Sequence, residues 1–453
     1  MSKLKYILFF TKFWDNAPDL PTGPTLFENC PVSNCFITNN RQELPSVSLF
    51  DAIIFHMADL ERLRPQELPN PQDRYPNQRY VMFFTESPQH WTADFAKFNN
   101  FFNWTMTYRL DSDIPNPYGW IVPKYSDKSH VPTIDEVGRW DHYLEKFDLE
   151  KFASSLNSRP ESFRALAQRP KRIAWIVSHC NSNSDRERYV NELRNYIPVD
   201  IFGKCDNKLC SAKTYSVQTC IDDVEQNYMF YLAFENSFCD HYVTEKLWMW
   251  LSTDIVPVVM GQADYAAITP PRSVINAGNF PEARDLATYL KQVMDNETEY
   301  LSHFWWKDFY EVNSNTRYKD TQSKIIQPSY CKLCQMLNDP EQPPKVWNNL
   351  GEWWSMTGGH CKPKGSYPWS RYRSLVEERL INEFFIFAMV LLICPLVFFI
   401  LFSRMRVRLC FWKLLFTVVP IISLFLISVL CRATLEIPWD SHLIYTRFHF
   451  LWK

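Results

Sequence analysis

Short apolar runs separated by polar loops fill the first third of the chain. The loop over 64–76 is rich in Pro, Gln and Asn, which is typical of a surface connection. Around 146–171 the sequence becomes charged and helical, and we expect a domain boundary there. The pattern predicts an α/β domain over 1–155 with strands rich in Ile, Val and Phe at 6–11, 52–56, 80–85 and 104–108.

The second third alternates strands and helices more regularly. A buried strand is predicted at 173–177, a helix at 186–196 with Tyr189, Val190 and Leu193 on one face, and a strand at 199–202. The same alternation continues with a strand at 229–234, a helix at 243–251 that Thr244 can cap, and a strand at 255–260. Such an order predicts a parallel sheet covered by helices on both faces, and we place this second domain at 165–340.

Two long apolar runs near the C-terminus add a membrane expectation. Residues 384–402 and 414–431 carry no charge, and each is long enough to cross a bilayer as a transmembrane helix. The alternative is a pair of helices buried in a large core. Basic residues between the runs favour a cytoplasmic loop, which would leave both the large domains and the tail, 432–453, on the lumenal side. The Trp- and Pro-rich stretch 341–383 would then lie next to the membrane.

The first ten residues do not support a lumenal protein. They lack the long apolar region and the small-residue cleavage site of a secretory signal, and they are better interpreted as the first strand. How the chain would enter the membrane is therefore open.

Composition bounds the function and the compartment. The formal net charge is −2 and no basic stripe is present, which argues against nucleic-acid binding. Thirteen cysteines and two N-glycosylation sequons, at Asn103 and Asn296, favour disulfides in an oxidising compartment. A four-cysteine zinc site is less suitable, because only Cys331 and Cys334 have CxxC spacing. The 17 Trp residues suit either a packed core or sugar-facing platforms.

Charged residues gather where the predicted strands of the second domain end. Arg186 begins a helix after strand 173–177, where a phosphate is well placed. Glu235 and Asn236 follow strand 229–234, at the edge where open α/β sheets bind ligands. Lys246 can neutralise a diphosphate, Glu245 can accept from ribose hydroxyls, and Tyr242 can stack or hydrogen-bond. From the residues alone, a surface helix start with a capping Glu is an equally good interpretation.

Ordered motifs along the chain decide between these interpretations. Residues 230–246 (FYLAFENSFCDHYVTEK), 255–261 (IVPVVMG) and 268–275 (ITPPRSVI) strongly resemble the α-1,3-fucosyltransferase family. Upstream, 51–56 (DAIIFH), 86–88 (ESP), 107–113 (TYRLDSD) and 174–178 (AWIVS) resemble further segments of that family. The closing CxxC at 331–334 does so too, and the similarity covers about 5–340.

The resemblance implies a fold and a set of roles. It implies two Rossmann-like domains of the GT-B type facing a cleft, with the acceptor on the N-terminal side and GDP-fucose on the C-terminal side. Arg186 and Lys246 would pair with the diphosphate, Tyr242 and Glu245 would hold the nucleotide, and Glu235 and Asn236 would line the same pocket. Glu86 matches the base that takes a proton from the acceptor hydroxyl in an inverting transfer.

The implied activity is transfer of L-fucose from GDP-fucose to N-acetylglucosamine in α-1,3 linkage on glycoprotein N-glycans, in the Golgi membrane with the catalytic domain lumenal. No cofactor is obligate. Asp111-Ser-Asp113 has the form of a metal-binding DxD but is interpreted as structural, so a divalent cation such as Mn²⁺ is compatible and not required.

Two alternatives remain. The first is a catalytically silent glycan- or nucleotide-binding membrane protein of the same fold. It is motivated by the missing N-terminal signal and by His179, which stands where the family usually has Asn, whereas the intact Glu86, Arg186 and Lys246 argue against it. The other alternative is a polytopic membrane protein whose soluble half regulates it. Two spans without an intramembrane charge argue against a transport path.

Overall fold

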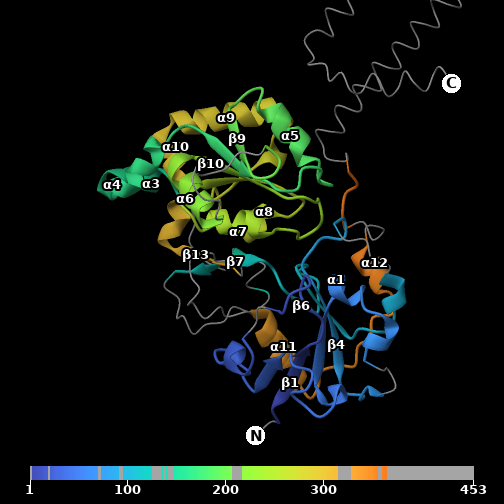
Figure 1. Cartoon of the computed structure of the whole chain (residues 1–453). Coiled ribbons are helices and arrows are strands. Elements are labelled where there is room, and N and C mark those ends of the chain that lie inside the picture. Colours follow the sequence, from blue (N-terminus) through green and yellow to red (C-terminus); the bar gives the residue numbers. More distant parts are fainter. Residues whose placement is uncertain are drawn as a thin grey trace, which may run out of the picture. The chain divides into compact units, whose positions relative to one another are not determined.

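In the computed structural model the described residues are 3–18, 21–69, 73–90, 95–124, 135, 139–140, 147–206, 217–314, 328–355 and 360–364. The chain divides into two compact units, 1–372 and 373–453, and all described residues lie in the first. This unit contains two parallel sheets, each covered by helices (Figure 1).

The first sheet has the strand order β2-β1-β3-β4-β5-β6, with every neighbouring pair parallel. Its strands are β1 (Lys5–Phe9), β2 (Cys35–Thr38), β3 (Ala52–His56), β4 (Arg79–Phe84), β5 (Trp104–Thr107) and β6 (Ile114–Pro115). Between them lie α1 (Met57–Leu60) and the 3-10 helices η1 (Thr25–Phe27), η2 (Val47–Leu49), η3 (Pro65–Glu67) and η5 (Phe95–Phe98).

Alternation along the strands of the first sheet builds two separate apolar layers. Ile7 and Phe9 pack on one face with α11 (Pro328–Asn338), whereas Leu8 packs on the other face with α12 (Leu350–Trp354). This is the period of two expected when both faces of a sheet are covered. Helices from the C-terminal part of the described chain thus complete the core of the N-terminal sheet.

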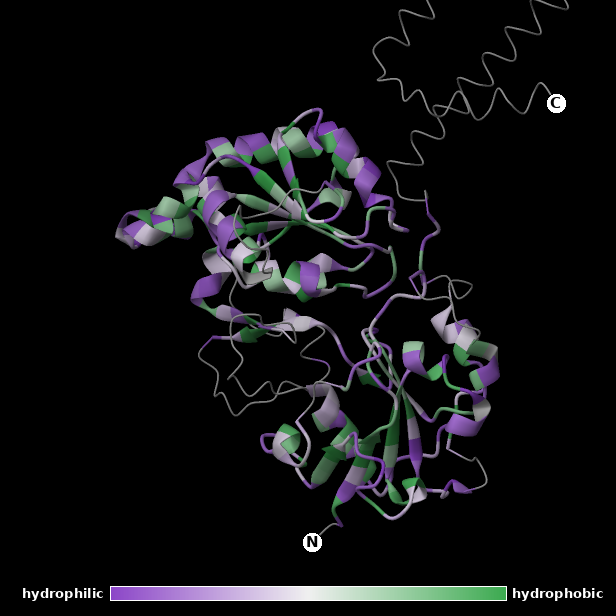
Figure 2. Cartoon of the chain, viewed as in Figure 1, coloured by the Kyte–Doolittle hydropathy of each residue, from purple (hydrophilic) through white to green (hydrophobic). Residues whose placement is uncertain are grey.

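The second sheet has the order β12-β11-β10-β8-β9, also entirely parallel. Its strands are β8 (Ile173–Ile176), β9 (Val199–Phe202), β10 (Phe230–Phe234), β11 (Val256–Met260) and β12 (Ile275–Asn276). Helices α5 (Arg186–Leu193) and α9 (Ala283–Asp295) cover one face, and α7 (Glu245–Leu251) and α8 (Tyr265–Ile268) the other (Figure 1). Figure 2 shows the resulting pattern of apolar strands and helices with polar outer stripes.

The remaining elements connect or flank the sheets. The short strands β7 (Gly119–Pro123) and β13 (Tyr310–Ser314) pair antiparallel. The other helices are α3 (Leu149–Ser155), η7 (Leu156–Ser158), α4 (Glu161–Arg164), η8 (Ala165–Gln168), α6 (Val217–Asn227), η9 (Ala277–Asn279), α10 (Glu297–Ser302) and η10 (Trp305–Asp308).

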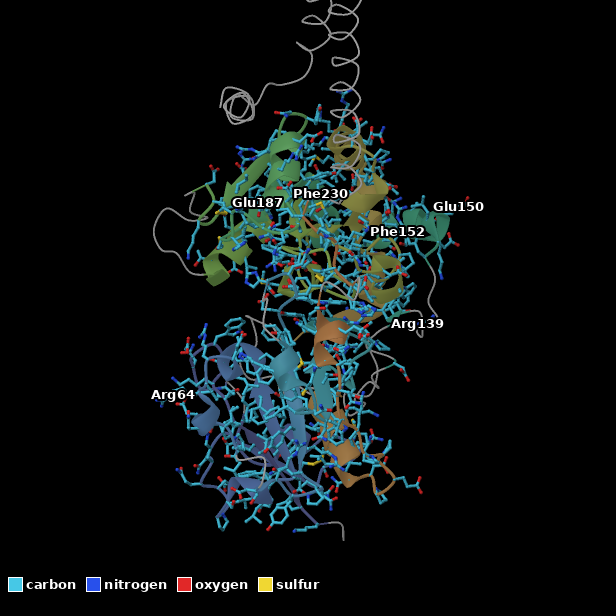
Figure 3. All side chains as sticks on the ribbon, turned by 90° about the vertical axis from the view of Figure 1, so that its right-hand side faces the viewer. Arg64, Arg139, Glu150, Phe152, Glu187 and Phe230 are labelled. Atoms are coloured by element: carbon cyan, nitrogen blue, oxygen red, sulfur yellow. A yellow bond between two sulfur atoms is a disulfide. The ribbon has the colours of Figure 1, made fainter. Side chains whose placement is uncertain are left out.

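Helix α11 is fixed covalently to the first sheet. Cys331 and Cys334 each form a disulfide, with Cys30 and Cys35 respectively, over sequence separations of 301 and 299 residues. Two further disulfides, Cys180–Cys205 and Cys239–Cys361, tie loops beside the second sheet, and such bonds appear in yellow in Figure 3. The predicted preference for disulfides over a zinc site is confirmed at these cysteines.

The two Rossmann-like α/β domains are confirmed, but the predicted fold class needs one correction. Within the described ranges, no helix is both long and apolar enough to cross a membrane. The expected transmembrane hairpin, 384–402 and 414–431, lies outside the described residues, as does the tail. We therefore correct the fold class of the described residues to two Rossmann-like domains. The predicted domain limits stay predictions.

Candidate active site

Strand order places the site before any side chain is considered. In the second sheet β8 and β10 are neighbours, and the chain runs from β8 to β9 on one side and from β10 to β11 on the other. A crevice forms at such a switch point, outside the carboxyl ends of the two central strands. The residues that follow β10 and the start of α5 therefore meet at the carboxyl edge of this sheet.

Arg186, the first residue of α5, is held at that edge. Its side chain is buried, and Nη1 donates to the carbonyl oxygen of Phe234 at 2.5 Å. Nη2 donates to the carbonyl oxygen of His179 at 3.4 Å, and Nε lies 3.3 Å from a carboxylate oxygen of Glu187. The guanidinium is thus anchored to the last residue of β10. Its predicted contact with the diphosphate of GDP-fucose stays a prediction. His179 contributes its backbone to this contact, so the departure from Asn leaves the anchor in place.

Glu235 organises the turn into α7. Its side chain is 1% exposed and accepts from the Thr244 amide at 2.7 Å and from the Thr244 hydroxyl at 2.9 Å. Burial raises the pKa of Glu235, although the Lys246 ammonium, 3.4 Å away, opposes the shift. Thr244 is also the N-cap of α7, as predicted, since its side chain accepts from the Lys246 amide.

Lys246 lies between two carboxylates. Its Nζ is 3.0 Å from Oε1 of Glu245 and donates to the Thr244 hydroxyl at 2.7 Å. Burial alone would lower the pKa of Lys246, but Glu235 and Glu245 outweigh it and raise it. For Glu245 burial works against ionisation, and the Lys246 charge nevertheless lowers its pKa. A fixed ammonium therefore stands at the start of α7.

Asn236 offers a buried acceptor at the same edge. Its Oδ1 has no hydrogen-bond partner within the described part of the chain, which is unusual for a buried amide oxygen. The Asn236 and Glu235 carbonyl oxygens accept from the amide and the hydroxyl of Ser184, at 2.9 and 2.6 Å. The loop before α5 is thereby closed onto the end of β10. A ligand hydroxyl or amine at this point would satisfy the Asn236 side chain.

Glu86 follows β4 of the first sheet and meets the second domain directly. Its Oε2 accepts a hydrogen bond from the Tyr242 hydroxyl at 3.0 Å. Tyr242 is 1% exposed, and its ring lies edge-on to Tyr108 with centroids 4.9 Å apart. Burial, and then the Glu86 charge, raise the pKa of Tyr242 well above its usual value, so the phenol stays protonated and donates. The candidate base is thus joined to the loop that leads into Lys246.

Four further residues, none of them predicted as site residues, contribute hydrogen bonds around the same contact. The Ser87 hydroxyl donates to that of Ser237 at 2.7 Å, and Gln89 accepts from the Phe238 amide at 3.2 Å. Asn183 donates to the Gln89 carbonyl oxygen at 2.8 Å. Both serines lie inside motifs that carried the family resemblance, so Ser87 and Ser237 could have been found there. Gln89 and Asn183 carry no comparable sequence signal.

The structure brings the predicted site residues to two places. One group surrounds the carboxyl end of β10 and consists of Arg186, Glu235, Asn236, Glu245 and Lys246. Their contacts with GDP-fucose stay predictions. Tyr242, which the resemblance assigns to the nucleotide, donates its hydroxyl to Glu86, and its contact with a nucleotide stays a prediction.

The DxD pair is engaged by the protein itself. Asp111 accepts from Nε and Nη2 of the buried Arg109, at 2.8 and 2.6 Å. Asp113 accepts from the Thr105 hydroxyl at 3.0 Å and from the Trp347 indole at 3.0 Å. The two carboxylates thus serve different partners, in agreement with their structural interpretation. Among the described residues no group of three or more His, Cys, Asp or Glu could hold a metal ion.

The two predicted glycosylation sites differ sharply. Asn103 is 5% exposed, its Nδ2 donates to the Lys345 carbonyl oxygen at 2.8 Å, and its Oδ1 accepts from the Tyr80 amide at 2.8 Å. A glycan would be attached through Nδ2, which is buried here against the Lys345 carbonyl oxygen, so modification of Asn103 would require this packing to change. Asn296 is exposed and caps α10 by accepting from the Glu299 amide at 3.0 Å. Asn296 stays a prediction.

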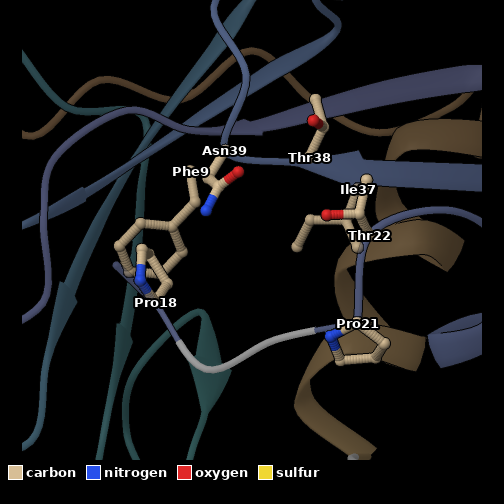
Figure 4. A pocket seen from close by; sticks show the side chains of 7 residues that line it. All are labelled: Phe9, Pro18, Pro21, Thr22, Ile37, Thr38 and Asn39. Carbon is tan, nitrogen blue, oxygen red and sulfur yellow. The ribbon is translucent and has the colours of Figure 1, made fainter. Parts of the chain in front are cut away.

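One small hollow lies beside the first sheet. Phe9, Ile37 and Thr38 line it together with Pro18 and Pro21 (Figure 4). Its volume is about 10 Å³, which is room for about one water molecule. This hollow is too small for a sugar or a nucleotide.

Comparison with known proteins agrees with this geometry. The family "Fucosyltransferase, N-terminal" matches residues 2–119, and "Glycosyltransferase family 10 (fucosyltransferase) C-term" matches 166–353. "Alpha-(1,3)-fucosyltransferase C" of Drosophila melanogaster is 35% identical over 328 residues, 72% of this chain and 70% of the relative. "4-galactosyl-N-acetylglucosaminide 3-alpha-L-fucosyltransferase FUT6" of Pongo pygmaeus is 31% identical over 312 residues, 68% of this chain and 72% of the relative.

A solved structure entitled "Crystal Structure of alpha1,3-Fucosyltransferase with GDP-fucose" is 16% identical, with a TM-score of 0.43. The match covers 76% of this chain and 92% of that one. Both domains match their family in chain order, and the match to the Drosophila relative covers 72% of this chain. This chain therefore belongs to glycosyltransferase family 10, the fucosyltransferases.

Proposed function

We propose that this chain transfers L-fucose from GDP-fucose, with inversion, to a hydroxyl of N-acetylglucosamine in α-1,3 linkage on glycoprotein N-glycans. The observation that carries the proposal is the hydrogen bond between Tyr242 and Glu86. It joins a carboxylate at the end of β4 to the loop that precedes the cation Lys246. The candidate base is thereby joined to the segment that carries the candidate diphosphate ligand Lys246.

The chemistry assigned to the residues is a single displacement. Glu86 takes the proton of the acceptor hydroxyl while that oxygen forms a bond to C1 of fucose. The bond from C1 to the diphosphate oxygen breaks on the opposite side, and the electron pair leaves with GDP. Arg186 and Lys246 balance the charge that grows on the leaving diphosphate, as fixed cations do in such sites.

The reaction as proposed runs without a metal ion. Asp111 accepts hydrogen bonds from Arg109, and Asp113 accepts them from Thr105 and Trp347. We therefore assign the DxD pair a structural role. Cations on the protein take the role that Mn²⁺ has in some glycosyltransferases. Transfer should therefore persist in the presence of EDTA, and a complete loss that Mn²⁺ restores would contradict this part.

We place the catalytic domains in the lumen of the Golgi. The disulfides that join α11 to the first sheet, across sequence separations of 301 and 299 residues, support an oxidising compartment such as the lumen of the secretory pathway. A lipid bilayer is not part of the proposal. Glycopeptide mapping after expression in a secretory host tests the compartment, with a glycan expected at Asn296 and none at Asn103. A chain with reduced cysteines and an unmodified Asn296 would contradict lumenal placement.

The direct test of activity uses the full chain, GDP-fucose and a panel of acceptors that includes N-acetylglucosamine, chitobiose and N-acetyllactosamine. We expect release of GDP with formation of a fucoside whose NMR spectrum shows an α linkage to O3 of N-acetylglucosamine. Binding of GDP-fucose without transfer to any acceptor of the panel would favour the catalytically silent alternative.

A further inference from the structure

A second, larger cavity lies beside the Glu86–Tyr242 contact. Its volume is about 150 Å³, and residues of both domains line it. The first domain contributes Tyr108 and Leu110, and the second contributes His241, Trp248, Asp264 and Ala267. A closed apolar cavity of similar size admits a benzene ring, so this one accommodates a ring-sized group.

Two aromatic rings in the wall suit the apolar face of a pyranose. Tyr108 and Trp248 are both buried, and each contributes a flat surface. The Gly119 backbone lies close against the indole, since a Cβ at this position would lie 2.5 Å from Cγ of Trp248. Rigid aromatic side chains of this kind bury apolar surface with little loss of side-chain entropy. The cavity therefore has an aromatic wall on this side, made by Tyr108 and Trp248.

Polar groups at the rim suit sugar hydroxyls. Nδ1 of His241 accepts from the Leu110 amide at 3.4 Å, so the neutral imidazole carries its proton on Nε2 and can donate. Burial lowers the pKa of His241 despite the nearby Asp111 and Asp240, which favours the neutral ring. Asp264 is exposed and accepts from the Ala267 amide at 3.2 Å, and a carboxylate has further acceptor capacity. A donor and an acceptor thus flank the two aromatic rings, as in many ligand pockets.

The position of the cavity excludes the nucleotide. Arg186, Glu235 and Lys246 are absent from its lining. Trp248 and Lys246 are two residues apart on α7, which places them about 200° apart around the helix. The aromatic wall therefore faces away from the ammonium that is assigned to the diphosphate.

The position also separates the cavity from the reacting hydroxyl. Glu86 does not line it, but Tyr108 does, and Tyr108 packs on Tyr242, whose hydroxyl lies 3.0 Å from Glu86. One buried tyrosine thus stands between the cavity wall and the candidate base. A group in the cavity is close to the base without being the group that the base deprotonates.

We propose that this cavity binds one pyranose ring of the acceptor glycan, the ring next to the N-acetylglucosamine that receives fucose. The inference rests on the proposed function, because it presupposes an acceptor whose hydroxyl is at Glu86. The apolar face of the ring lies on Tyr108 and Trp248, and its hydroxyls meet His241 and Asp264.

The test fills the cavity and compares acceptors of different length. Ala267→Trp places an indole in the cavity, and Ala266→Trp is its matched control, because Ala266 is exposed on the same helix and does not line the cavity. The acceptors are free N-acetylglucosamine and whichever of chitobiose and N-acetyllactosamine the wild type uses better. Melting temperature and GDP affinity are recorded for each variant.

We expect Ala267→Trp to lower kcat/KM about tenfold or more for the disaccharide, a free-energy difference of about 1.4 kcal/mol, and to leave the value for free N-acetylglucosamine unchanged. Ala266→Trp should leave both unchanged. If Ala267→Trp is poorly folded, His241→Gly serves instead, because glycine accepts the positive φ of 60° at this position. Equal losses on both acceptors, or no loss on either, would overturn the inference. Absence of transfer by the wild type would instead remove the proposed function.

Discussion

Replacing Tyr242 by Phe removes one hydroxyl from the contact between the two domains and leaves the ring. The Tyr242 phenol is buried and donates to Glu86 at 3.0 Å. A hydrogen bond to a charged group contributes about 1.5–3 kcal/mol, and Glu86 is only half-buried, so we take the lower end. Loss of the bond should therefore lower the free energy of unfolding by about 1.5 kcal/mol.

The same hydrogen bond holds the Glu86 carboxylate in one position, which proton transfer from the acceptor hydroxyl requires. We therefore expect kcat for fucose transfer to fall in Tyr242→Phe. The loss should be less than about tenfold, because the packed ring still holds the loop in place.

The assay is urea denaturation together with fucose transfer, in which kcat and the KM for GDP-fucose are recorded for each variant. Tyr118→Phe is the matched control, since its hydroxyl donates to the Thr85 carbonyl oxygen at 2.9 Å and not to a carboxylate. The control should leave kcat unchanged. An unchanged kcat in Tyr242→Phe together with an increased KM for GDP-fucose would refute the reasoning. It would return Tyr242 to the nucleotide.

Three further outcomes are expected. Lys246→Ala should abolish GDP-fucose binding and lower the unfolding free energy by about 3 kcal/mol, because it leaves the buried Glu235 carboxylate unpaired. Adding Glu235→Gln should restore stability in urea denaturation without restoring binding. Joint replacement of Cys331 and Cys334 by Ser should lower the unfolding free energy by about 2–5 kcal/mol per disulfide, whereas a melting temperature equal to that of the wild type would contradict a stapling role for α11. Burial lowers the pKa of His303 to about 4, so between about pH 6.5 and 4 the unfolded chain binds a proton that the folded chain excludes. The free energy of unfolding should therefore fall by up to about 3 kcal/mol as the pH drops through this range. His303→Gln should reduce this pH dependence in urea denaturation.

Strong local patterns were sufficient to predict much of the fold. The apolar runs 52–56 and 199–202 are strands with the predicted limits, and the predicted helix at 243–251 begins at Glu245 behind the cap residue Thr244. Short or mixed segments were missed, as with β2, which spans only Cys35–Thr38. Helix α9 was also not predicted, although its apolar residues recur with helical spacing and could have indicated it.

Contacts between distant segments were beyond the reach of the pattern. Nothing in the spacing of α11 says that it packs on β1 and β2 rather than on the preceding domain, because that contact spans about 300 residues. The motifs correctly brought Glu235 and Lys246 together, since both flank one short turn. The bond from Tyr242 to Glu86 crosses 156 residues, and local chemistry offered several uses for a tyrosine at that place.

The most direct measurement of the central claim is the rate of fucose transfer by Glu86→Gln beside its affinity for GDP-fucose. Glutamine keeps the shape of the side chain and an oxygen that can accept from Tyr242, but it cannot take a proton. If Glu86 is the base, kcat should fall by about 10²–10⁴-fold while GDP-fucose binds with unchanged affinity. Transfer at nearly the wild-type rate would contradict the account.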